Sequence, residues 1–291
     1  MIIKLILALV LGLIAGGAVN ALADDLPLRR SPRLPRYIPN EKKRATHSRD
    51  ENERALTQID DERRPLSAWL GITAFLLGKR VSPKGVKLGW RYPITEVFTI
   101  ALMVIAVLAT NGDPDVPPLQ LAFWLGYMAI FALITVIDIE HKLILFVVII
   151  PSALFAVLDA VLTPLRAEPN LRDALIGGAA GFIVFFILYN GGFLFTYIMG
   201  MVRGKKITEV AFGYGDVMMA GLSGLILGWQ ALIFALFITV FLGAFGAMLY
   251  LISRALIRSK YSAFTALPYG PYIVAGTLIM LLFSAEISQL F

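Results

Sequence analysis

The sequence predicts an all-α integral membrane protein, a bundle of about eight transmembrane helices with a large cytoplasmic loop between the first and the second. Composition is the first reason: 58% of the 291 residues are hydrophobic, 16% are charged, and the mean hydropathy is +0.77. No soluble domain of this size would expose so apolar a surface. The second reason is that apolar stretches recur along the chain, and open sheet edges cannot face lipid, which favours helices.

Each apolar stretch is predicted to be one helix, because about 20 residues rising about 1.5 Å each cross a hydrocarbon layer of about 30 Å. The stretches are residues 1–23, 93–110, 119–137, 143–162, 174–200, 217–229, 231–253 and 268–285. The sixth is short, and Gly228-Trp229-Gln230 is expected to turn the chain after it. The chain is thus divided into a first transmembrane helix (1–23), a basic loop (24–92) and a seven-helix core (93–291).

Charge orients these helices. Sixteen of the 26 Lys and Arg residues lie between Asp24 and Pro93, and most others lie in the third, fifth and seventh connections. By the positive-inside rule the odd-numbered connections are cytoplasmic. Asp138 and Asp216 both fall on odd connections, so both are expected at the cytoplasmic face.

The first helix has an alternative interpretation, because Ala21-Leu22-Ala23 is typical of a signal-peptidase site. The basic loop that follows would resist export, which favours a retained helix. Gly12 and Gly16, four residues apart, provide a face on which it could pack against another helix.

The loop has two parts. Residues from Arg29 to Arg64 carry many charges of both signs and are predicted to be flexible. Residues 65–78 are apolar but too short to span comfortably, which indicates a short helix at the interface or packed against the bundle.

Composition also excludes several classes of function. There is no Cys, so disulfides, thiolate metal sites and cysteine catalysis are excluded. The net charge of +6 comes from loops beside anionic lipid, and there is no nucleic-acid motif, so membrane lipid is the expected partner of this charge.

The acidic pair carries the chemistry, because a carboxylate at the edge of a bilayer is costly. If Asp138 and Asp216 lie within a few ångströms, repulsion favours one proton shared between them. Such a pair can activate water and polarise a peptide carbonyl, as aspartic proteases do. Gly213 and Gly215 would let an extended substrate approach the site. A proton or ion pathway, as in a carrier, and a purely structural contact remain alternatives on residue type alone.

Other polar or conformationally special residues are weaker candidates for substrate contact or for shaping the site. Glu140 and Lys142 follow Asp138 and are typical of a solvated helix end, and Glu96 is expected to cap its own helix. Asp159 is expected to be solvated at the outer face. Pro268, Gly270 and Pro271 are expected to unwind the last helix beside the site, with a simple helix start as the alternative.

Five segments of the chain resemble motifs of the type IV prepilin leader peptidases, a family of intramembrane aspartic proteases. In the order of the family they are Gly16-Gly17-Ala18-Val19-Asn20, Arg91-Tyr92-Pro93-Ile94-Thr95-Glu96, the segment from Asp138 to Ile144, Phe212-Gly213-Tyr214-Gly215-Asp216-Val217, and Leu267-Pro268-Tyr269-Gly270-Pro271-Tyr272. The resemblance runs nearly end to end. It implies a prepilin peptidase of the inner membrane with Asp138 and Asp216 as the catalytic pair.

The resemblance further implies substrates. These would be prepilins and pilin-like proteins of type II secretion, recognised through their apolar N-terminal helix and cut after a short basic leader on the cytoplasmic side, between Gly and Phe. The peptidase step needs no cofactor.

The chain departs from the family at a zinc site. Many members carry two Cys pairs in the first cytoplasmic loop and are linked with methylating the new N-terminus from S-adenosylmethionine. Here Val81 and Lys84 stand at the second pair's positions, so zinc is not expected. Asp25 stands where the family usually has Arg. The departures leave N-methyltransferase activity open.

Overall fold

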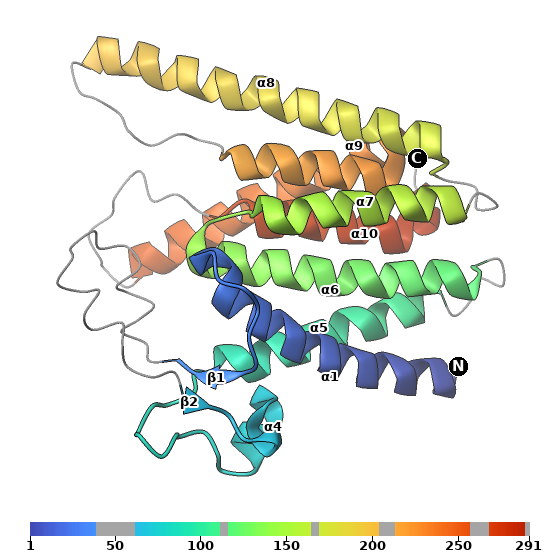
Figure 1. Cartoon of the computed structure of the whole chain (residues 1–291). Helices are drawn as coiled ribbons and strands as arrows, with labels where there is room; N and C mark the ends of the chain where they lie inside the picture. Colours follow the sequence, from blue (N-terminus) through green and yellow to red (C-terminus); the bar gives the residue numbers. More distant parts are fainter. Residues whose placement is uncertain (39–61, 111–115, 164–168, 204–212, 257–267, 289–291) are drawn as a thin grey trace. The chain divides into compact units, whose positions relative to one another are not determined.

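The computed structural model describes residues 1–38, 62–110, 116–163, 169–203, 213–256 and 268–288 (Figure 1). It is helical almost throughout, which confirms the predicted fold class. The long helices are α1 (Ile2–Asp25), α5 (Arg91–Ala109), α6 (Pro118–His141), α7 (Phe146–Leu162), α8 (Leu171–Arg203), α9 (Tyr214–Leu256) and α10 (Gly270–Ser288). Five of them, α1, α5, α6, α8 and α9, are long and apolar enough to cross a membrane, and α7 and α10 contain shorter apolar helices. The chain is therefore a multi-pass membrane protein.

Helix α9 is broken where the sequence predicts a turn. Gly228 has φ 75° and ψ 170° inside an otherwise helical run of 43 residues. This left-handed φ is unfavourable for residues with a Cβ, so glycine suits the break. Two helical halves result, and the predicted sixth and seventh helices are these halves.

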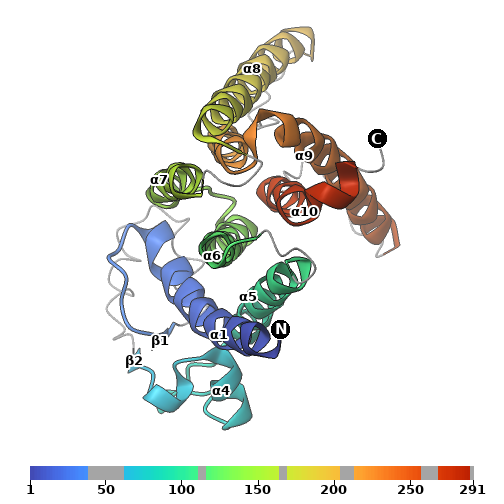
Figure 2. The same cartoon turned by 90° about the vertical axis from the view of Figure 1, so that its right-hand side faces the viewer.

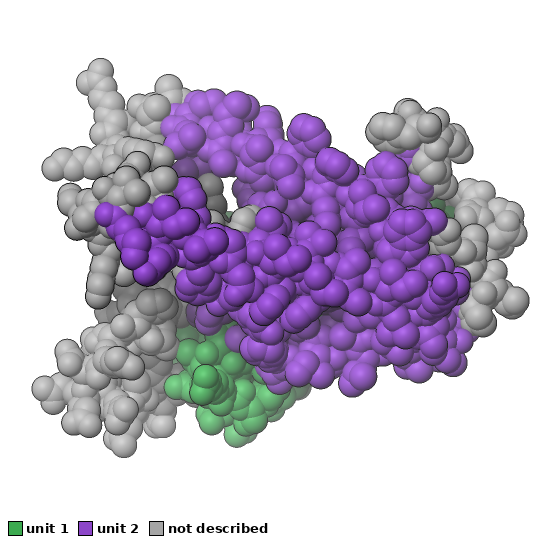
Figure 3. Space-filling model, turned by 90° about the horizontal axis from the view of Figure 1, so that it is seen from above, with its two compact units in different colours: residues 1–111, 124–136 green, residues 112–123, 137–291 purple. Residues whose placement is uncertain are grey.

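The chain divides into two compact units, residues 1–111 with 124–136 and residues 112–123 with 137–291 (Figure 3). Helix α6 contributes to both. In the first unit α1 packs along α5, as Figure 2 shows. Gly12 and Gly16 face α5, where added Cβ atoms would stand 2.7 Å from the Cα atoms of Ile100 and Glu96. The predicted packing face is confirmed.

The segment between α1 and α5 is structured at both ends. Strand β1 (Arg36–Tyr37) pairs antiparallel with β2 (Glu62–Arg63), and a 3-10 turn (Leu66–Ala68) leads to the short helix α4 (Gly71–Leu76). The prediction of one flexible stretch from Arg29 to Arg64 is wrong at these ends, because strand pairing joins them. Its middle, 39–61, lies outside the described residues. Helix α4 packs against α5, which confirms a short helix on the bundle.

In the second unit, α9 contacts α7, α8 and α10. Helices α8 and α9 approach so closely that a Cβ at Gly224 would collide with the backbone of Gly177. Small residues allow such backbone contact between membrane helices, where van der Waals packing holds helices together.

Two expectations for this unit need correction. Asp159 is not solvated: it is 9% exposed, and Gln120 Nε2 lies 3.2 Å from each of its carboxylate oxygens while Thr163 donates to Oδ1 at 2.9 Å. These donors compensate the buried charge. Pro268 precedes α10, which begins at Gly270, so the described residues show the alternative of a helix start rather than an unwound helix.

The α8–α9 contact generates a prediction. Gly224→Leu should lower the melting temperature by several degrees, because overpacking costs about 1–3 kcal/mol or more. Thermal unfolding in detergent would measure it. Gly191→Leu on α8 is the matched control, because a Cβ at Gly191 meets open space. Equal melting temperatures for the two variants would contradict the packing.

Candidate active site

The second unit brings Asp138 and Asp216 together. Asp138 lies one turn before the end of α6 and Asp216 lies in the first turn of α9. The two carboxylates are near enough to interact electrostatically. Asp138 is 5% exposed and Asp216 is half-buried. Two like charges held close in a partly desolvated place favour a shared proton.

The Asp216 carboxylate is held by its own loop. The backbone N–H of Gly213 donates to Asp216 Oδ2 at 3.0 Å, and the N–H of Asp216 returns a hydrogen bond to the Gly213 carbonyl at 3.1 Å. Gly215 packs on Ile144, where a Cβ would stand 2.8 Å from the Ile144 Cβ. The two glycines of the motif therefore fix the carboxylate and bring the start of α9 against the α6–α7 connection.

The start of α10 faces Asp138. The backbone N–H of Gly270 interacts with the Asp138 carboxylate, and a Cβ at Gly270 would stand 2.6 Å from Oδ2. That oxygen is buried and has no hydrogen-bond partner among the described residues. An unpartnered buried carboxylate oxygen is unusual and is the kind of atom that a proton, a water or a substrate would satisfy.

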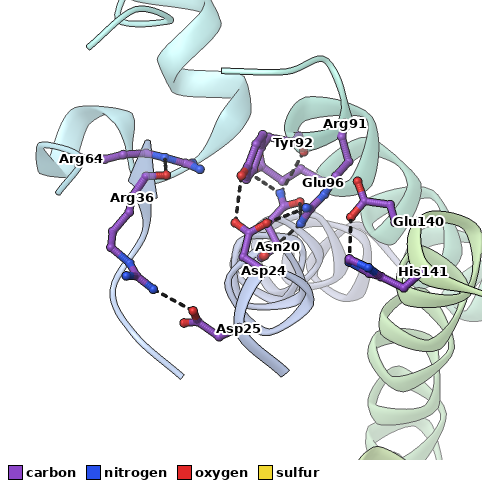
Figure 4. A network of polar contacts seen from close by, with 10 residues as sticks. All are labelled: Asn20, Asp24, Asp25, Arg36, Arg64, Arg91, Tyr92, Glu96, Glu140 and His141. Carbon is purple, nitrogen blue, oxygen red and sulfur yellow. Dashed lines mark hydrogen bonds and ion pairs between the residues drawn. The ribbon is translucent and has the colours of Figure 1, made fainter. Parts of the chain in front are cut away.

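The end of α6 contributes one further charge. Lys142 adopts a left-handed conformation, φ 53°, and its N–H donates to the Asp138 carbonyl at 2.8 Å. This cap keeps Lys142 close to Asp138, with which its charge interacts. Glu140 lies 4.0 Å from His141, both at the helix end (Figure 4).

Tyr269 was not singled out from the sequence, and it belongs to this region. Its phenol interacts electrostatically with Asp216. Burial, and then the Asp216 charge, raises the pKa of Tyr269. The only sequence signal was its place beside Gly270 and Pro271 in a quoted motif.

Glu96 lies in the first unit and has a different function from the expected one. It is fully buried and accepts the N–H groups of Gly71 at 2.5 Å and Ile72 at 2.8 Å, so it caps α4 rather than its own helix. Asn20 donates to it at 3.3 Å. The expectation that Glu96 caps its own helix is therefore wrong, because α4 offers free backbone donors at that place.

A polar network surrounds this cap in the first unit (Figure 4). Asp25 pairs with Arg36 at 2.7 Å, and Asp24 pairs with Arg91 at 2.6 Å. The guanidinium of Arg64 lies 4.2 Å from the ring centre of Tyr92. Burial lowers the pKa of Arg64, while nearby Tyr92 and Asp24 act in the opposite direction.

Within the described residues, the side chains at the positions of the family's Cys pairs offer no site for a zinc ion. The chain has no Cys, and no group of three or more His, Asp or Glu side chains in the described part could hold a metal. Val81 instead forms an isolated β-bridge with Lys87, closed by a turn from Ser82 to Gly85 whose N–H···O distance is 2.8 Å.

Comparison with known proteins finds similarity to one family. Residues 124–248, which contain Asp138 and Asp216, match the model of the type IV leader peptidase family. The segment that carries both aspartates is thus similar to this family. No solved structure matches it.

Curated relatives of the chain are described as prepilin leader peptidase/N-methyltransferase. One from Aeromonas salmonicida is 28% identical, over 77% of this chain and 67% of its own length. One from Pseudomonas aeruginosa is 24% identical, over 97% of this chain and 91% of its own length. One from Myxococcus xanthus is 30% identical, over 65% of this chain and 49% of its own length. A carrier gains no support from these similarities.

The Glu96 cap generates a prediction. Glu96→Gln keeps the shape but replaces an acceptor oxygen with a donor, so an N–H of Gly71 or Ile72 should lose its partner at a cost of about 1–3 kcal/mol. Hydrogen exchange at these two amides should become faster. Glu140→Gln is the control, and unchanged exchange in Glu96→Gln would contradict the cap.

Proposed function

We propose that the chain is a prepilin signal peptidase in which Asp138 and Asp216 are the catalytic pair. Its substrates are prepilins, as the names of its relatives suggest, and also pilin-like proteins, as the motif resemblance implies. The observation that carries the proposal is the meeting of two carboxylates, one with an unpartnered oxygen, at the start of α9 and the end of α6.

The proposed reaction is hydrolysis of a peptide bond by two carboxyl groups that share one proton. The ionised carboxylate takes a proton from water as the water oxygen attacks the scissile carbonyl carbon, while the protonated carboxyl gives its proton to the carbonyl oxygen. The C–N bond of the tetrahedral intermediate then breaks as the leaving amine takes a proton from the first carboxyl. The second carboxylate takes a proton from one hydroxyl of the intermediate, so that the carboxylic acid product forms and the pair again holds one proton. Which aspartate begins protonated is a property of the pair.

The surroundings suit a substrate that presents an extended peptide next to an apolar helix. Gly213, Gly215 and Gly270 leave the main chain without side chains beside both carboxylates. The basic residues of the odd-numbered connections support a site at the cytoplasmic face of the inner membrane. A basic leader would remain on that side, and the apolar substrate helix would lie in lipid.

The catalytic pair generates a prediction. Asp138→Asn and Asp216→Asn should each lower kcat for a purified prepilin by about 10²- to 10⁴-fold or more, because each removes one proton-transfer group. Cleavage in liposomes, with the product identified by mass, would measure this. Asp173→Asn is the control, because Asp173 is partly exposed and its hydrogen bonds among the described residues are local, to Asn170. Cleavage by both variants at the wild-type rate would overturn the aspartic mechanism.

The same assay separates the second activity of the relatives. With S-adenosylmethionine present, a product heavier by one methyl group would show that N-methylation persists in a chain without Cys. A product of unchanged mass would show a peptidase alone.

We further propose that the described parts of the basic loop, residues 24–38 and 62–92, are held without zinc by ion pairs and a small apolar core. That core consists of Tyr37, Ala68, Ala74, Leu88 and Tyr92. The Asp25–Arg36 pair and the Arg36 carbonyl, which accepts Arg64 Nε at 2.8 Å, join the end of α1 to β1 and to the residue after β2. Buried pairs of this kind are costly to break singly.

Metal chelation and mutation of the ion pair should therefore differ in their effect on stability. EDTA should leave the melting temperature and cleavage unchanged, whereas Arg36→Ala, which leaves buried Asp25 without its ion-pair partner, should destabilise the segment by about 3–5 kcal/mol. Lys84→Ala, at an exposed position, is the control. Loss of stability in EDTA, restored by added zinc, would overturn the proposal.

A further inference from the structure

The residues between α4 and α5 form a small hairpin, residues 79–90. Val81 and Lys87 form an antiparallel bridge, and the N–H of Leu88 donates to the Arg80 carbonyl at 2.8 Å. The hairpin therefore presents its side chains from an ordered main chain.

A cation held between two aromatic rings joins the hairpin to α4. The guanidinium of Arg80 lies 4.9 Å from the ring centre of Phe75 in α4 and 5.4 Å from that of Trp90. The two rings are themselves 4.7 Å apart, and Arg80 Nε donates to the Leu88 carbonyl at 3.1 Å. Aromatic faces attract a cation at these distances. Helix α4 and the hairpin thus form one continuous surface.

Large apolar side chains are exposed on this surface. Leu76 is 80% exposed and Trp90 is 61% exposed, and Leu66, Leu77 and Val81 are exposed as well. The segment has a buried core of its own, built by other residues such as Ala74 and Leu88. The exposed side chains are therefore those that the core leaves outside.

The charge on this surface has one sign. The sequence from Pro65 to Thr95 contains no Asp or Glu, and Lys79, Lys84 and Lys87 are exposed. Glu96, the first acidic residue after it, is fully buried in the cap of α4. Exposed apolar side chains among basic residues are typical of a surface that binds anionic lipid.

The surface also lies at the end of a membrane-spanning helix. Helix α4 packs on the first turn of α5, where a Cβ at Gly71 would stand 2.6 Å from the nitrogen of Pro93 and from the Cβ of Tyr92 (Figure 1). Helix α5 is long and apolar enough to cross a membrane, so its first turn lies near one boundary of the hydrocarbon layer. The exposed side chains of α4 are then close to the lipid headgroups.

We propose that α4 and the hairpin bind the surface of a membrane that contains anionic lipid. Leu76, Leu77 and Trp90 enter the headgroup region, and the exposed lysines of the hairpin bind the lipid phosphates. The basic leader of a prepilin does not fit this surface, because its charge has the same sign. The inference goes beyond the proposed peptidase function and does not depend on it.

The lack of Cys allows a single reporter to test the proposal. The full chain with Leu77→Cys, labelled with an environment-sensitive fluorophore, is placed in nanodiscs of phosphatidylcholine with or without phosphatidylglycerol. With phosphatidylglycerol, we expect emission at shorter wavelength and quenching by headgroup nitroxides that is about twofold stronger or more, because anionic lipid attracts nearby lysines. High salt should remove the difference, because it screens exposed charges.

Charge variants identify the groups responsible. Lys84→Glu combined with Lys87→Glu should abolish the effect of phosphatidylglycerol. Arg172→Glu, at an exposed position in the second unit, is the charge control and should keep it. In detergent these proteins should melt as the unsubstituted protein does, because the replaced side chains are exposed. If the double variant is unstable, Lys84→Gln with Lys87→Gln removes the charges without reversing them and should give the same loss.

Two outcomes would overturn the proposal. One is equal emission and quenching in the two kinds of nanodisc, or a difference that persists in the lysine variants. The other is a signal that depends on the lysines equally in both lipids, which would indicate an acidic protein segment as the occupant instead of lipid.

Discussion

The cost of placing carboxylates among membrane-spanning helices is the constraint on which this structure depends. Two buried acidic groups outside the candidate site are met by hydrogen-bond donors. Glu96 receives the backbone of α4, and Asp159 receives Gln120 and Thr163. Asp138 differs, because its Oδ2 is buried without a hydrogen-bond partner among the described residues and a second carboxylate interacts with it. Unmet polar groups of this kind are where chemistry is expected, because substrate and water can satisfy them.

Close backbone approach then determines the geometry of the site. Gly215 allows α9 to begin against Ile144, Gly270 allows α10 to begin against Asp138, and Gly243 leaves room for the Tyr269 ring. The two carboxylates meet because three helix ends converge, and none of these approaches tolerates a Cβ without movement. The first unit is stabilised in a different way. There, ion pairs and a buried cap order a polar segment in a chain that has no Cys.

Sequence alone predicts what is local or follows from hydropathy. The helical segments, the break at Gly228, the Gly12–Gly16 face and the short helix within 65–78 all follow from apolar runs and glycine placement, and the structure has them. Contacts between distant residues could not be predicted in this way. The cap of α4 by Glu96, the donors around Asp159, the pairing of β1 with β2 and the packing of the Tyr269 ring on Gly243 each depend on how the chain packs. Their residues looked solvated, flexible or ordinary in the sequence.

The central claim is that Asp138 and Asp216 lie side by side, and the lack of Cys makes it directly measurable. With cysteines at positions 138 and 216, a bifunctional thiol reagent spanning a few ångströms should crosslink the pair rapidly. Wild type should not react, because it has no thiol. Cysteines at positions 138 and 173 should not crosslink. The helix α7 runs between these positions, and at about 1.5 Å per residue its 17 residues separate them by more than such a reagent spans. Crosslinking at 138 and 216 no faster than at 138 and 173 would contradict the account.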